Sequence, residues 1–542
     1  MWPIRGRPGV AGSGKWERWG PVREIWGDDG TLAGFGFGEQ MEGALDTGEQ
    51  SRSAEQPEAS ASDIRRSLAR PLPEQAQVIV IGSGPGGAIT ACLLAEAGRD
   101  VLLVESGTYF EPETEARFDA QEMQRKYRNG GVTTALGATK IAYAEGQCVG
   151  GGSEINAGLY HRAPDELLDQ WQRDFGLADA SAVEMAAHFE ACERDVGVSL
   201  MPHGAPPASL KLYRGAEALG WQAMEVPRIF RYTPAGAPLK QSMSRTFLPR
   251  AVAAGCKLIT NARAQRIRRE GGRWMVEVEH TPPGGEPSRR TLSCETLFVS
   301  AGAIHTPALL LRSGITHNVG RTLQMHPTVK VAARFGETVN ARDLGVPVHQ
   351  VKEFSPRIGF GCSISKPPHL SLAMLDHPEH ARTVDSDWQR MAVYYAMIKG
   401  GSGRVRTLPA FRDPVVSYKL GVEDRRDLAD GLKKLCEMLF AAGAQVLYPS
   451  VAAFPALRSL DDVSRLPDVL PDDASLMTVH LFSSCPMGED EARCATDSFG
   501  RVHDQPNLHI ADASLLCTSL GVNPQGSVMA FARRNALHFL SH

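Results

Sequence analysis

The chain has 542 residues, of which 42% are hydrophobic and 22% charged, the usual mix of a globular protein with a sizeable core. Its 58 basic and 62 acidic residues give a formal net charge of -4, which offers no attraction for phosphate backbones and argues against nucleic acid as a partner. The 54 glycines exceed the average share. Because glycine lets backbone wrap closely around a ligand, we expect a cofactor-binding fold.

Membrane and secretion signals are missing from the sequence. No stretch sustains the roughly 18 apolar residues that a bilayer span needs, and the N-terminus lacks the apolar run of a secretory signal. The ten cysteines are sparse for this length, and Cys92 and Cys436 lie in apolar helical patterns, where reduced thiols act as small hydrophobic groups. We expect a cytoplasmic protein without a membrane span or a disulfide framework.

Residues 1–72 differ in composition from the rest of the chain. They are rich in Gly, Ser, Glu and Gln and show no sustained helical or alternating period. Four of the eight tryptophans lie here, which is unusual for a disordered segment: Trp2, Trp16, Trp19 and Trp26. We expect a flexible N-terminal leader.

A βαβ unit follows the leader. Residues 78–81 read as a short buried strand, residues 88–97 as a helix after a Gly-rich turn, and residues 100–105 as a second strand. Further along, the patterns predict strands at 295–301, 391–398 and 414–420 and helices at 306–313 and 428–442. No repeat of 20 to 50 residues is visible, which excludes solenoids and propellers.

The turn of this unit carries a dinucleotide fingerprint. Gly82, Gly84 and Gly87 match G-x-G-x-x-G, in which glycines allow the tight turn and let backbone N–H groups approach a pyrophosphate. Glu105 closes the second strand near the ~20-residue distance at which such folds place the acid that binds a ribose hydroxyl. The fingerprint by itself does not separate FAD from NAD.

A second glycine loop separates them. Residues 146–156 read GQCVGGGSEIN and resemble the flavin loop of the glucose-methanol-choline (GMC) family of FAD-dependent oxidoreductases, with departures at Gln147 and Gly152. The resemblance implies FAD contacts from Gly150, Gly151, Ser153 and Asn156. Some family members attach FAD covalently through a His before this Asn. Ile155 stands there in this chain, so we expect non-covalent FAD.

Two further segments extend the resemblance, which covers roughly residues 77–535. Residues 302–315 are similar to the second family signature, which ends in Gly where this chain has Thr316. Residues 319–327 continue as the family does. Ala301, at the end of the preceding strand, is implied as an FAD contact, whereas we interpret His305 and His326 as structural or supporting residues.

The third segment carries the chemistry. Residues 480–488 read HLFSSCPMG and resemble the family run H-x-x-G-T-C-x-M-G, in which the His is the catalytic base; Ser483 and Ser484 replace Gly and Thr. Downstream, the family carries a second His or an Asn as catalytic partner, and this chain has Asn523. The resemblance also implies FAD contacts from Asp512, Ala513 and Pro524. A helix is expected at 525–536.

These residue types suit alcohol oxidation. An alcohol gives up hydride only when its hydroxyl proton leaves, and a neutral imidazole acting as general base contributes ~10²- to 10⁴-fold. We therefore predict His480 as the base, with a pKa near the ~6.5 reference value. Asn523 would hold the substrate oxygen, and the N-terminus of the following helix would stabilise negative charge on reduced flavin.

Metal binding and an anion site are disfavoured. Cys485 and Cys494 with His480 and His503 fit no metal-ligand spacing, so we expect no metal. The pair Arg533 and Arg534 reads as a solvated helix end.

The resemblance implies an α/β fold: a Rossmann-like FAD-binding domain with a discontinuous substrate domain built on an antiparallel sheet. The expected FAD domain comprises residues 73–165, 241–327 and 476–542, and the substrate domain residues 166–240 and 328–475. Apolar strands at 391–398 and 415–418 favour a hydrophobic alcohol. The chain is thus expected to be an FAD-dependent alcohol oxidase or dehydrogenase, with O₂ or another electron acceptor. Two alternatives stay open: a lyase of the hydroxynitrile type using the same His, and a non-catalytic flavoprotein.

Overall fold

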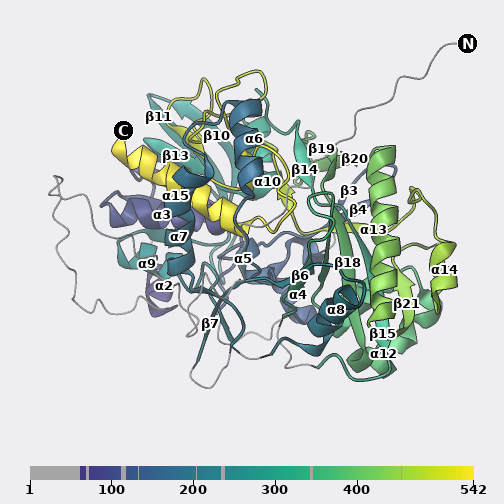
Figure 1. The fold of residues 1–542 in the computed structure, drawn as a ribbon. Coiled ribbons are helices and arrows are strands. Elements are labelled where there is room, and N and C mark those ends of the chain that lie inside the picture. The colour runs from purple at the N-terminus through teal and green to yellow at the C-terminus, as the bar shows by residue number, and fades with distance from the viewer. Residues whose placement is uncertain are drawn as a thin grey trace, which may run out of the picture. The chain divides into compact units, whose positions relative to one another are not determined.

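A computed structural model of the chain describes residues 61–68, 73–111, 118–131, 133–202, 204–233, 238–341, 346–452 and 454–542 (Figure 1). The chain consists of two units, Met1–Pro57 and Glu58–His542, and all described residues belong to the second. The four clustered tryptophans, and most of the expected leader, lie outside the described residues.

The end of the expected leader is helical. Helix α2 spans Ala61–Leu68 and buries Ile64, which is 0% exposed. The hydroxyl of Ser67 accepts a hydrogen bond of 3.0 Å from the backbone N–H of Leu258 in strand β9 (Lys257–Ile259). The prediction of a flexible leader is therefore wrong for these residues, because one side of this short helix is part of the buried interior.

A five-stranded parallel sheet forms one half of the described structure. Its strand order is β24-β13-β1-β2-β9, with β1 at Val78–Ile81, β2 at Val101–Val104, β13 at Thr296–Val299 and β24 at Leu508–Ile510. Helix α3 (Pro85–Glu96) connects β1 to β2 and packs against α15 (Gln525–Ser541) and α9 (Phe247–Ala253) (Figure 1). The predicted βαβ unit is confirmed.

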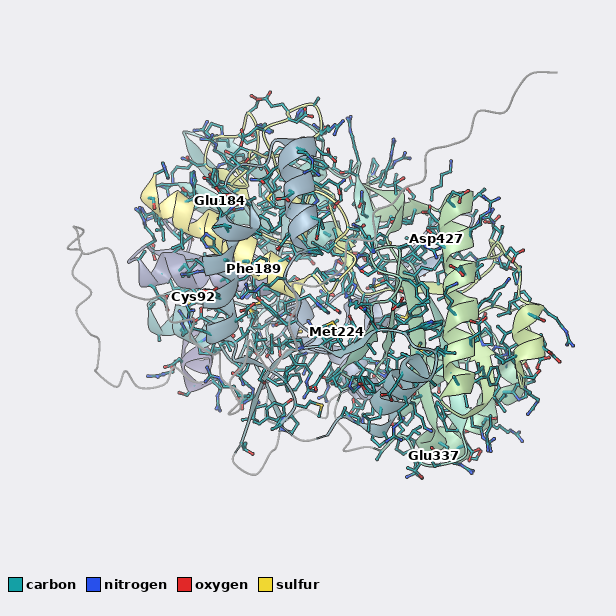
Figure 2. All side chains as sticks on the ribbon, viewed as in Figure 1. Cys92, Glu184, Phe189, Met224, Glu337 and Asp427 are labelled. Carbon is teal, nitrogen blue, oxygen red and sulfur yellow. The ribbon has the colours of Figure 1, made fainter. Side chains whose placement is uncertain are left out.

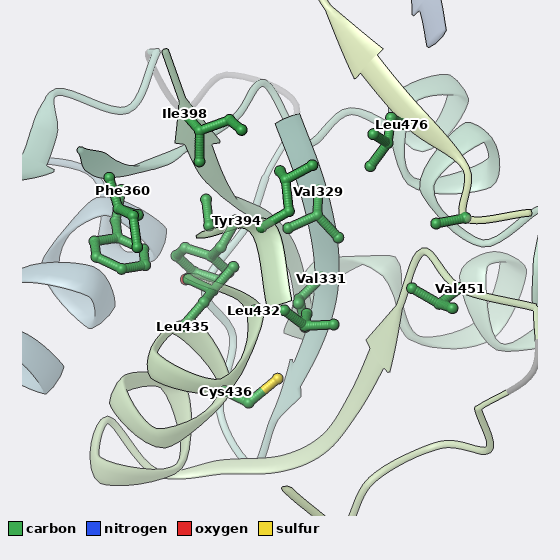
Figure 3. Packing of buried hydrophobic residues seen from close by; sticks show 14 of the residues in the cluster. Val329, Val331, Phe360, Tyr394, Ile398, Leu432, Leu435, Cys436, Val451 and Leu476 are labelled. Atoms are coloured by element: carbon green, nitrogen blue, oxygen red, sulfur yellow. The ribbon is translucent and has the colours of Figure 1, made fainter. Parts of the chain in front are cut away.

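The second large sheet has nine strands and is mostly antiparallel. Its centre is formed by β15 (Thr328–Phe335), β18 (Met391–Ile398) and β17 (Ile358–Cys362), and β16 (His349–Val351) lies beyond β17. Helix α13 (Val422–Ala441) covers one face. Figure 3 shows Val331 and Tyr394 of this face beside Leu432 and Leu435 of the helix. The predicted strand at 391–398 is confirmed, and the helix expected at 428–442 begins earlier, at a first turn that is polar and contains Glu423 and Asp424.

The remaining elements complete the two halves. The helices are α4 (Ala120–Lys126), α5 (Gly152–Ile155), α6 (Asp165–Phe175), α7 (Ala182–Asp195), α8 (Pro207–Ala218), α10 (Gly302–Arg312), α11 (Pro367–Ala373), α12 (Ala381–Asp387) and α14 (Leu460–Ser464). The strands are β3 (Thr133–Ala135), β4 (Ile141–Tyr143), β5 (Val198–Ser199), β6 (Ala223–Glu225), β7 (Arg228–Tyr232), β8 (Pro238–Lys240), β10 (Ala262–Glu270), β11 (Arg273–His280), β12 (Ser288–Cys294), β14 (Leu323–Met325), β19 (Gly400–Arg406), β20 (Val415–Lys419), β21 (Ala444–Pro449), β22 (Leu476–Thr478) and β23 (Leu481–Phe482). Short 3₁₀ helices span Arg128–Gly131, Pro378–His380, Trp388–Arg390 and Ala513–Leu515.

Two side-chain environments bear on the sequence analysis. All ten cysteines are buried free thiols, among them Cys92 on α3 (Figure 2). Arg534 is 4% exposed, and its guanidinium donates to the carbonyls of Ala178, Asp179 and Ser498. The prediction of a solvated arginine is therefore wrong, because Arg534 holds α15 to two loops. Within the described ranges, no helix has both the length and the apolar content for crossing a bilayer.

Candidate active site

The first glycine loop presents an open helix N-terminus. A Cβ on Gly82 would lie 2.2 Å from the Ser300 carbonyl oxygen, and one on Gly87 would lie 1.9 Å from the Gly82 carbonyl oxygen, so both positions are closed by backbone packing. A Cβ on Gly84 would meet nothing within 4 Å. Gly84 is the N-cap of α3, where no side chain caps the helix and the first turn holds no acid. This arrangement suits a pyrophosphate, because helix N-termini attract anions.

The second glycine loop lies directly beside the first. The backbone N–H of Gly150 donates to the Ser83 hydroxyl at 3.0 Å, and a Cβ on Gly151 would lie 2.9 Å from the Cα of Gly84. The Ser153 hydroxyl donates to the Gly150 carbonyl at 2.7 Å and accepts from the Met243 N–H at 3.0 Å. The two loops, predicted from separate motifs, therefore form one cradle lined by backbone.

Glu105 lies at the end of β2 and is 6% exposed. One carboxylate oxygen accepts hydrogen bonds from the backbone N–H and the hydroxyl of Ser83, at 2.9 and 2.7 Å, and the other accepts from the Gly107 N–H at 2.7 Å. Glu105 thus fixes the shape of the first loop. Its contact with a ribose stays a prediction.

Asp512 joins the start of α10 to the end of β24. It accepts from the Gly302 N–H at 2.9 Å and from the Ser514 N–H at 2.8 Å, and burial raises its pKa. Ala301 is the N-cap of α10, and Ala513 begins the short 3₁₀ helix that follows Asp512. The three predicted positions are therefore brought together beside the first loop, since a Cβ on Gly86 would lie 1.8 Å from the Ala511 carbonyl.

Asn156 connects the second glycine loop to α15. Its amide nitrogen donates to the Gln525 side-chain oxygen at 2.5 Å, and its amide oxygen accepts from the Gly158 N–H at 3.0 Å. Pro524 is the N-cap of α15, where no side chain caps the helix. The loop and the open N-terminus of α15 are thus neighbours, as a site for an anionic ring system requires.

His480 and Asn523, the predicted catalytic pair, face each other. His480 follows β22 and is 8% exposed. Its Nε2 lies 3.2 Å from the amide nitrogen of Asn523. The amide oxygen of Asn523 accepts from the Gln350 Nε2 at 3.0 Å, and the Gln350 Oε1 lies 3.1 Å from the His161 Nε2. Four residues that are far apart in the sequence, His161, Gln350, His480 and Asn523, therefore meet in one hydrogen-bonded chain.

His326 extends this chain on the other side of His480. The Nδ1 atoms of the two rings are 3.0 Å apart, and the Gly521 N–H donates to the His326 Nε2 at 2.9 Å. A backbone N–H can only donate, so the proton of neutral His326 lies on Nδ1. His480 therefore accepts at Nδ1 and carries its own proton on Nε2. The Asn523 amide must then be turned to present its oxygen to His480, and the Gln350 amide must turn with it, so that its oxygen accepts from Asn523 and its nitrogen donates to the His161 Nε2. Amide orientation follows from the hydrogen-bond network rather than from shape.

The three histidines of this hydrogen-bonded chain are held neutral. Burial, and then the charge of Lys352, lowers the pKa of His480 to about 4. Burial also lowers the pKa of His326 and His161 well below the usual range. The expected pKa near 6.5 for His480 is therefore wrong in this environment, because removing an imidazolium from water disfavours its charged form.

Sequence reasoning missed Gln350, Lys352 and His161. Gln350 and Lys352 belong to β16 and the residue after it, and neither lies in a recognisable motif. The register places Gln350 opposite Gly361, and Gly361 opposite Tyr395. The Gln350 Nε2 reaches the Tyr395 hydroxyl at 3.4 Å. Strand alternation is the only signal that could have grouped these side chains, and it requires knowledge of the pairing.

The apolar strand residues divide between core and site. Ala392, Tyr394, Ala396 and Ile398 belong to the buried cluster under α13 (Figure 3). Tyr395 and Met397 lie on the opposite face of β18, which Tyr395 shares with Gln350. Met391 and Val393, also on that face, belong to a second buried cluster, so most of the aromatic and apolar content of β18 that suggested a hydrophobic alcohol serves the core. Among the described His, Cys, Asp and Glu residues, no group of three is arranged to hold a metal ion.

The parallel sheet with its glycine cradle and the buried His–Asn pair define the class of the protein as a flavin-dependent oxidoreductase. Sequence profiles described as GMC oxidoreductase match residues 123–328 and 401–532, and a profile of an NAD(P)-binding Rossmann-like domain matches residues 80–110. The chain belongs to the GMC oxidoreductase family of FAD-dependent enzymes. The predicted family and fold class are confirmed.

Relatives share most of the chain. An uncharacterised GMC-type oxidoreductase y4nJ of Sinorhizobium fredii is 39% identical over 492 residues, which cover 88% of this chain and 97% of the relative. Long-chain-alcohol oxidase FAO3 of Arabidopsis thaliana is 26% identical, over 84% of this chain and 66% of its own length.

Solved structures show the same fold. Pyridoxine 4-oxidase from Mesorbium loti has a TM-score of 0.67 at 19% identity, and the match covers 86% of this chain and 99% of that one. A variant of formate oxidase from Aspergillus oryzae has a TM-score of 0.68 at 14% identity, covering 87% of this chain and 99% of that one. At these identities the likeness concerns the fold alone.

Proposed function

We propose that the protein oxidises the CH–OH group of an alcohol with a hydrophobic body, using FAD. The observation that carries this proposal is the contact between the His480 Nε2 and the Asn523 amide, which are 3.2 Å apart. Asn523 stands one residue before Pro524, the N-cap of α15. When bound, FAD supplies the hydride acceptor, its N5 atom. The chain itself must supply a group that takes the hydroxyl proton and a group that holds the oxygen, and this pair can do both.

The proton transfer sets a requirement on the histidine pair. The hydroxyl proton of the alcohol would pass to the His480 Nε2, which needs a free lone pair there. For this, the His326 Nδ1 proton must pass to the His480 Nδ1, the His480 Nε2 proton must be released to solvent, and the His326 Nε2 must take up a proton from solvent, so that both rings stay neutral. This reversal leaves the Gly521 N–H without its acceptor. Asn523 would hold the substrate oxygen while the proton leaves.

The cofactor residues follow from the cradle. The open space at Gly84 and the uncapped N-terminus of α3 fit a pyrophosphate. We assign the FAD contacts to the predicted residues: Gly82, Gly84, Gly87, Glu105, Gly150, Gly151, Ser153, Asn156, Ala301, Asp512, Ala513 and Pro524. Ile155 has no nucleophilic atom, so FAD would be held without a covalent bond. Acid precipitation should then release the yellow colour into the supernatant, and colour kept in the pellet would contradict this.

Substrate and domain assignments are part of the same proposal. Support for a hydrophobic alcohol comes from Met397 and Tyr395 on the face of β18 that faces away from α13, and from the relatives named long-chain-alcohol oxidases. The proposed division into an FAD domain (73–165, 241–327, 476–542) and a substrate domain (166–240, 328–475) is supported in part by two separate buried clusters, one around the parallel sheet and one between α13 and the nine-stranded sheet. Helices α6 and α7, which the division assigns to the substrate domain, contribute Trp171 and Phe189 to the cluster around the parallel sheet instead.

Anaerobic mixing with alcohols tests the function. An oxidoreductase bleaches its flavin when a substrate is added, whereas a lyase or a non-catalytic flavoprotein does not. His480→Ala should keep FAD and the fold but slow bleaching by about 100-fold or more, the scale of a general-base contribution. Admitting air afterwards shows whether O₂ or another acceptor reoxidises the flavin. Bleaching of His480→Ala at the wild-type rate would place the base elsewhere.

A further inference from the structure

The catalytic pair lies within a group of five nitrogen bases. Three are the histidines of the hydrogen-bonded chain, His161, His326 and His480. The others are two lysines. Lys352 stands two residues after Gln350 and continues the pairing, since its N–H donates to the Gln222 carbonyl at 3.0 Å. Its side chain therefore leaves the strand on the same face as that of Gln350.

The second lysine reaches the loop that carries Asn523. Lys399 follows β18, and its side chain packs against Gly521, where an added Cβ would lie 2.9 Å from the Lys399 Cδ. Gly521 is the residue whose N–H donates to His326. The two lysines thus approach the histidine chain from two different elements.

The positive charge of the group comes from the two lysines, because the three histidines are neutral. The charge of Lys352 lowers the pKa of all three histidines, and that of Lys399 lowers the pKa of His326. Burial lowers the pKa of Lys352 itself to about 8. Among the described residues, no Asp or Glu shifts the pKa of any of the five groups, and no acceptor is hydrogen-bonded to the ammonium of Lys352.

A half-buried ammonium without a counter-ion opposes folding, because desolvation of the charge is not offset by a partner. Arg334, by contrast, has such a partner, since its guanidinium is paired with Asp387 at 2.6 Å. The missing negative charge is therefore best supplied by a ligand. Two lysines at a site, with no acid that shifts their pKa values, favour a molecule of opposite charge.

We propose that the site takes alcohols that carry an anionic group, a carboxylate, with Lys352 as its counter-ion. The inference rests on the proposed alcohol oxidation and adds a charge requirement to the hydrophobic body. In a rival interpretation, the lysines instead stabilise negative charge that develops during the oxidation of every alcohol. The two interpretations differ in whether Lys352 distinguishes charged from neutral substrates.

A matched substrate series tests the charge requirement. The probes are hydroxyalkanoates with increasing distance between hydroxyl and carboxylate, each compared with its methyl ester. We expect kcat/KM for at least one acid to exceed that of its ester about tenfold or more. In Lys352→Met this acid-to-ester ratio should fall by about 10- to 100-fold, the scale of a charge-assisted hydrogen bond. Lys140→Met removes an exposed lysine elsewhere and should keep the ratio.

Binding without turnover separates this inference from the proposed function. An alkanoate without a hydroxyl should perturb the flavin absorbance of the holoenzyme and bind more tightly than the corresponding amide. If no alcohol bleaches the flavin but the alkanoate preference is present, the proposed function fails and the anion site stands. Equal kcat/KM for acids and esters, or equal slowing of both by Lys352→Met, overturns the anion site. If Lys352→Met does not fold, Lys352→Arg keeps the charge and should retain the preference; its loss there also overturns the proposal.

Discussion

A single backbone N–H decides the tautomer of His480 in the structure. The Gly521 N–H fixes the His326 Nε2 as an acceptor. The direction of the hydrogen bonds from His326 to His480 and from His480 to Asn523 follows from that contact. Either ring alone could adopt both neutral tautomers. The side chain of His326 therefore acts on the chemistry through His480, as a positioning residue.

Substitution of His326 should release this constraint. In His326→Phe the His480 Nδ1 has no donor facing it, so ¹⁵N NMR of histidine-labelled holoenzyme should show a mixture of tautomers. The wild type should show a protonated Nε2 and an unprotonated Nδ1. His326→Gln keeps one donor and one acceptor and should restore most of the wild-type signal. A wild-type His480 protonated on Nδ1 would refute the direction assigned to the chain.

The pH dependence follows from the lowered pKa of His480. Its value falls from 6.5 to about 4 on folding, so between these values the unfolded state binds more protons than the folded state. Stability should therefore rise with pH across this window. Protonation of His480 should lower the rate of flavin reduction only near pH 4, and not near pH 6.5.

Stopped-flow bleaching and thermal unfolding across pH check these expectations. His480→Ala should lose the acid limb of the rate. Asn523→Ala should retain the limb while lowering the rate by about 10- to 1,000-fold, the scale of losing one preorganised donor. A wild-type limb centred at 6.5 would show that His480 is solvated during turnover.

At the scale of elements, the N-terminus of α3 separates packing from ligand binding. A Cβ on Gly86 would lie 1.8 Å from the Ala511 carbonyl, whereas one on Gly84 would meet no atom. Gly84 also has a φ of −63°, which alanine adopts without strain. The same glycine turn thus contains three positions closed by backbone packing, Gly82, Gly86 and Gly87, and one that only a cofactor would need, Gly84.

Two alanine substitutions should therefore behave differently. Gly84→Ala should fold with a near wild-type melting temperature yet bind FAD much more weakly, because its methyl group occupies the proposed pyrophosphate position. Gly86→Ala should fail to fold or melt at a clearly lower temperature. Flavin content after gel filtration and thermal unfolding of the apoprotein measure the two effects. Full FAD content in Gly84→Ala would show that the pyrophosphate does not bind at this turn.

At the scale of the whole molecule, predictability depended on whether a site residue lay in a local motif. The βαβ unit, the cradle glycines and the pair His480–Asn523 each lie in short patterns that specify a turn, a cap or a reactive group. Gln350 and Lys352 reach the same site only through pairing of β16 with β17 and β6. Such long-range register leaves no local pattern, and burial of Arg534 likewise depends on loops far away in the sequence.

Helix α2 marks how far the chain can be shortened from its N-terminus before buried contacts of the described fold are lost. A protein that begins at Glu58 retains α2 and should keep its flavin content and turnover. One that begins at Pro73 loses Ile64 from the interior and leaves the buried Leu258 N–H without the Ser67 hydroxyl. An unsatisfied buried donor costs about 1 to 3 kcal/mol, and a lost core side chain about 2 to 5 kcal/mol. The shorter protein should therefore melt at a lower temperature, as should full-length Ile64→Ala. Equal melting temperatures for both truncations would show that α2 contributes nothing to stability.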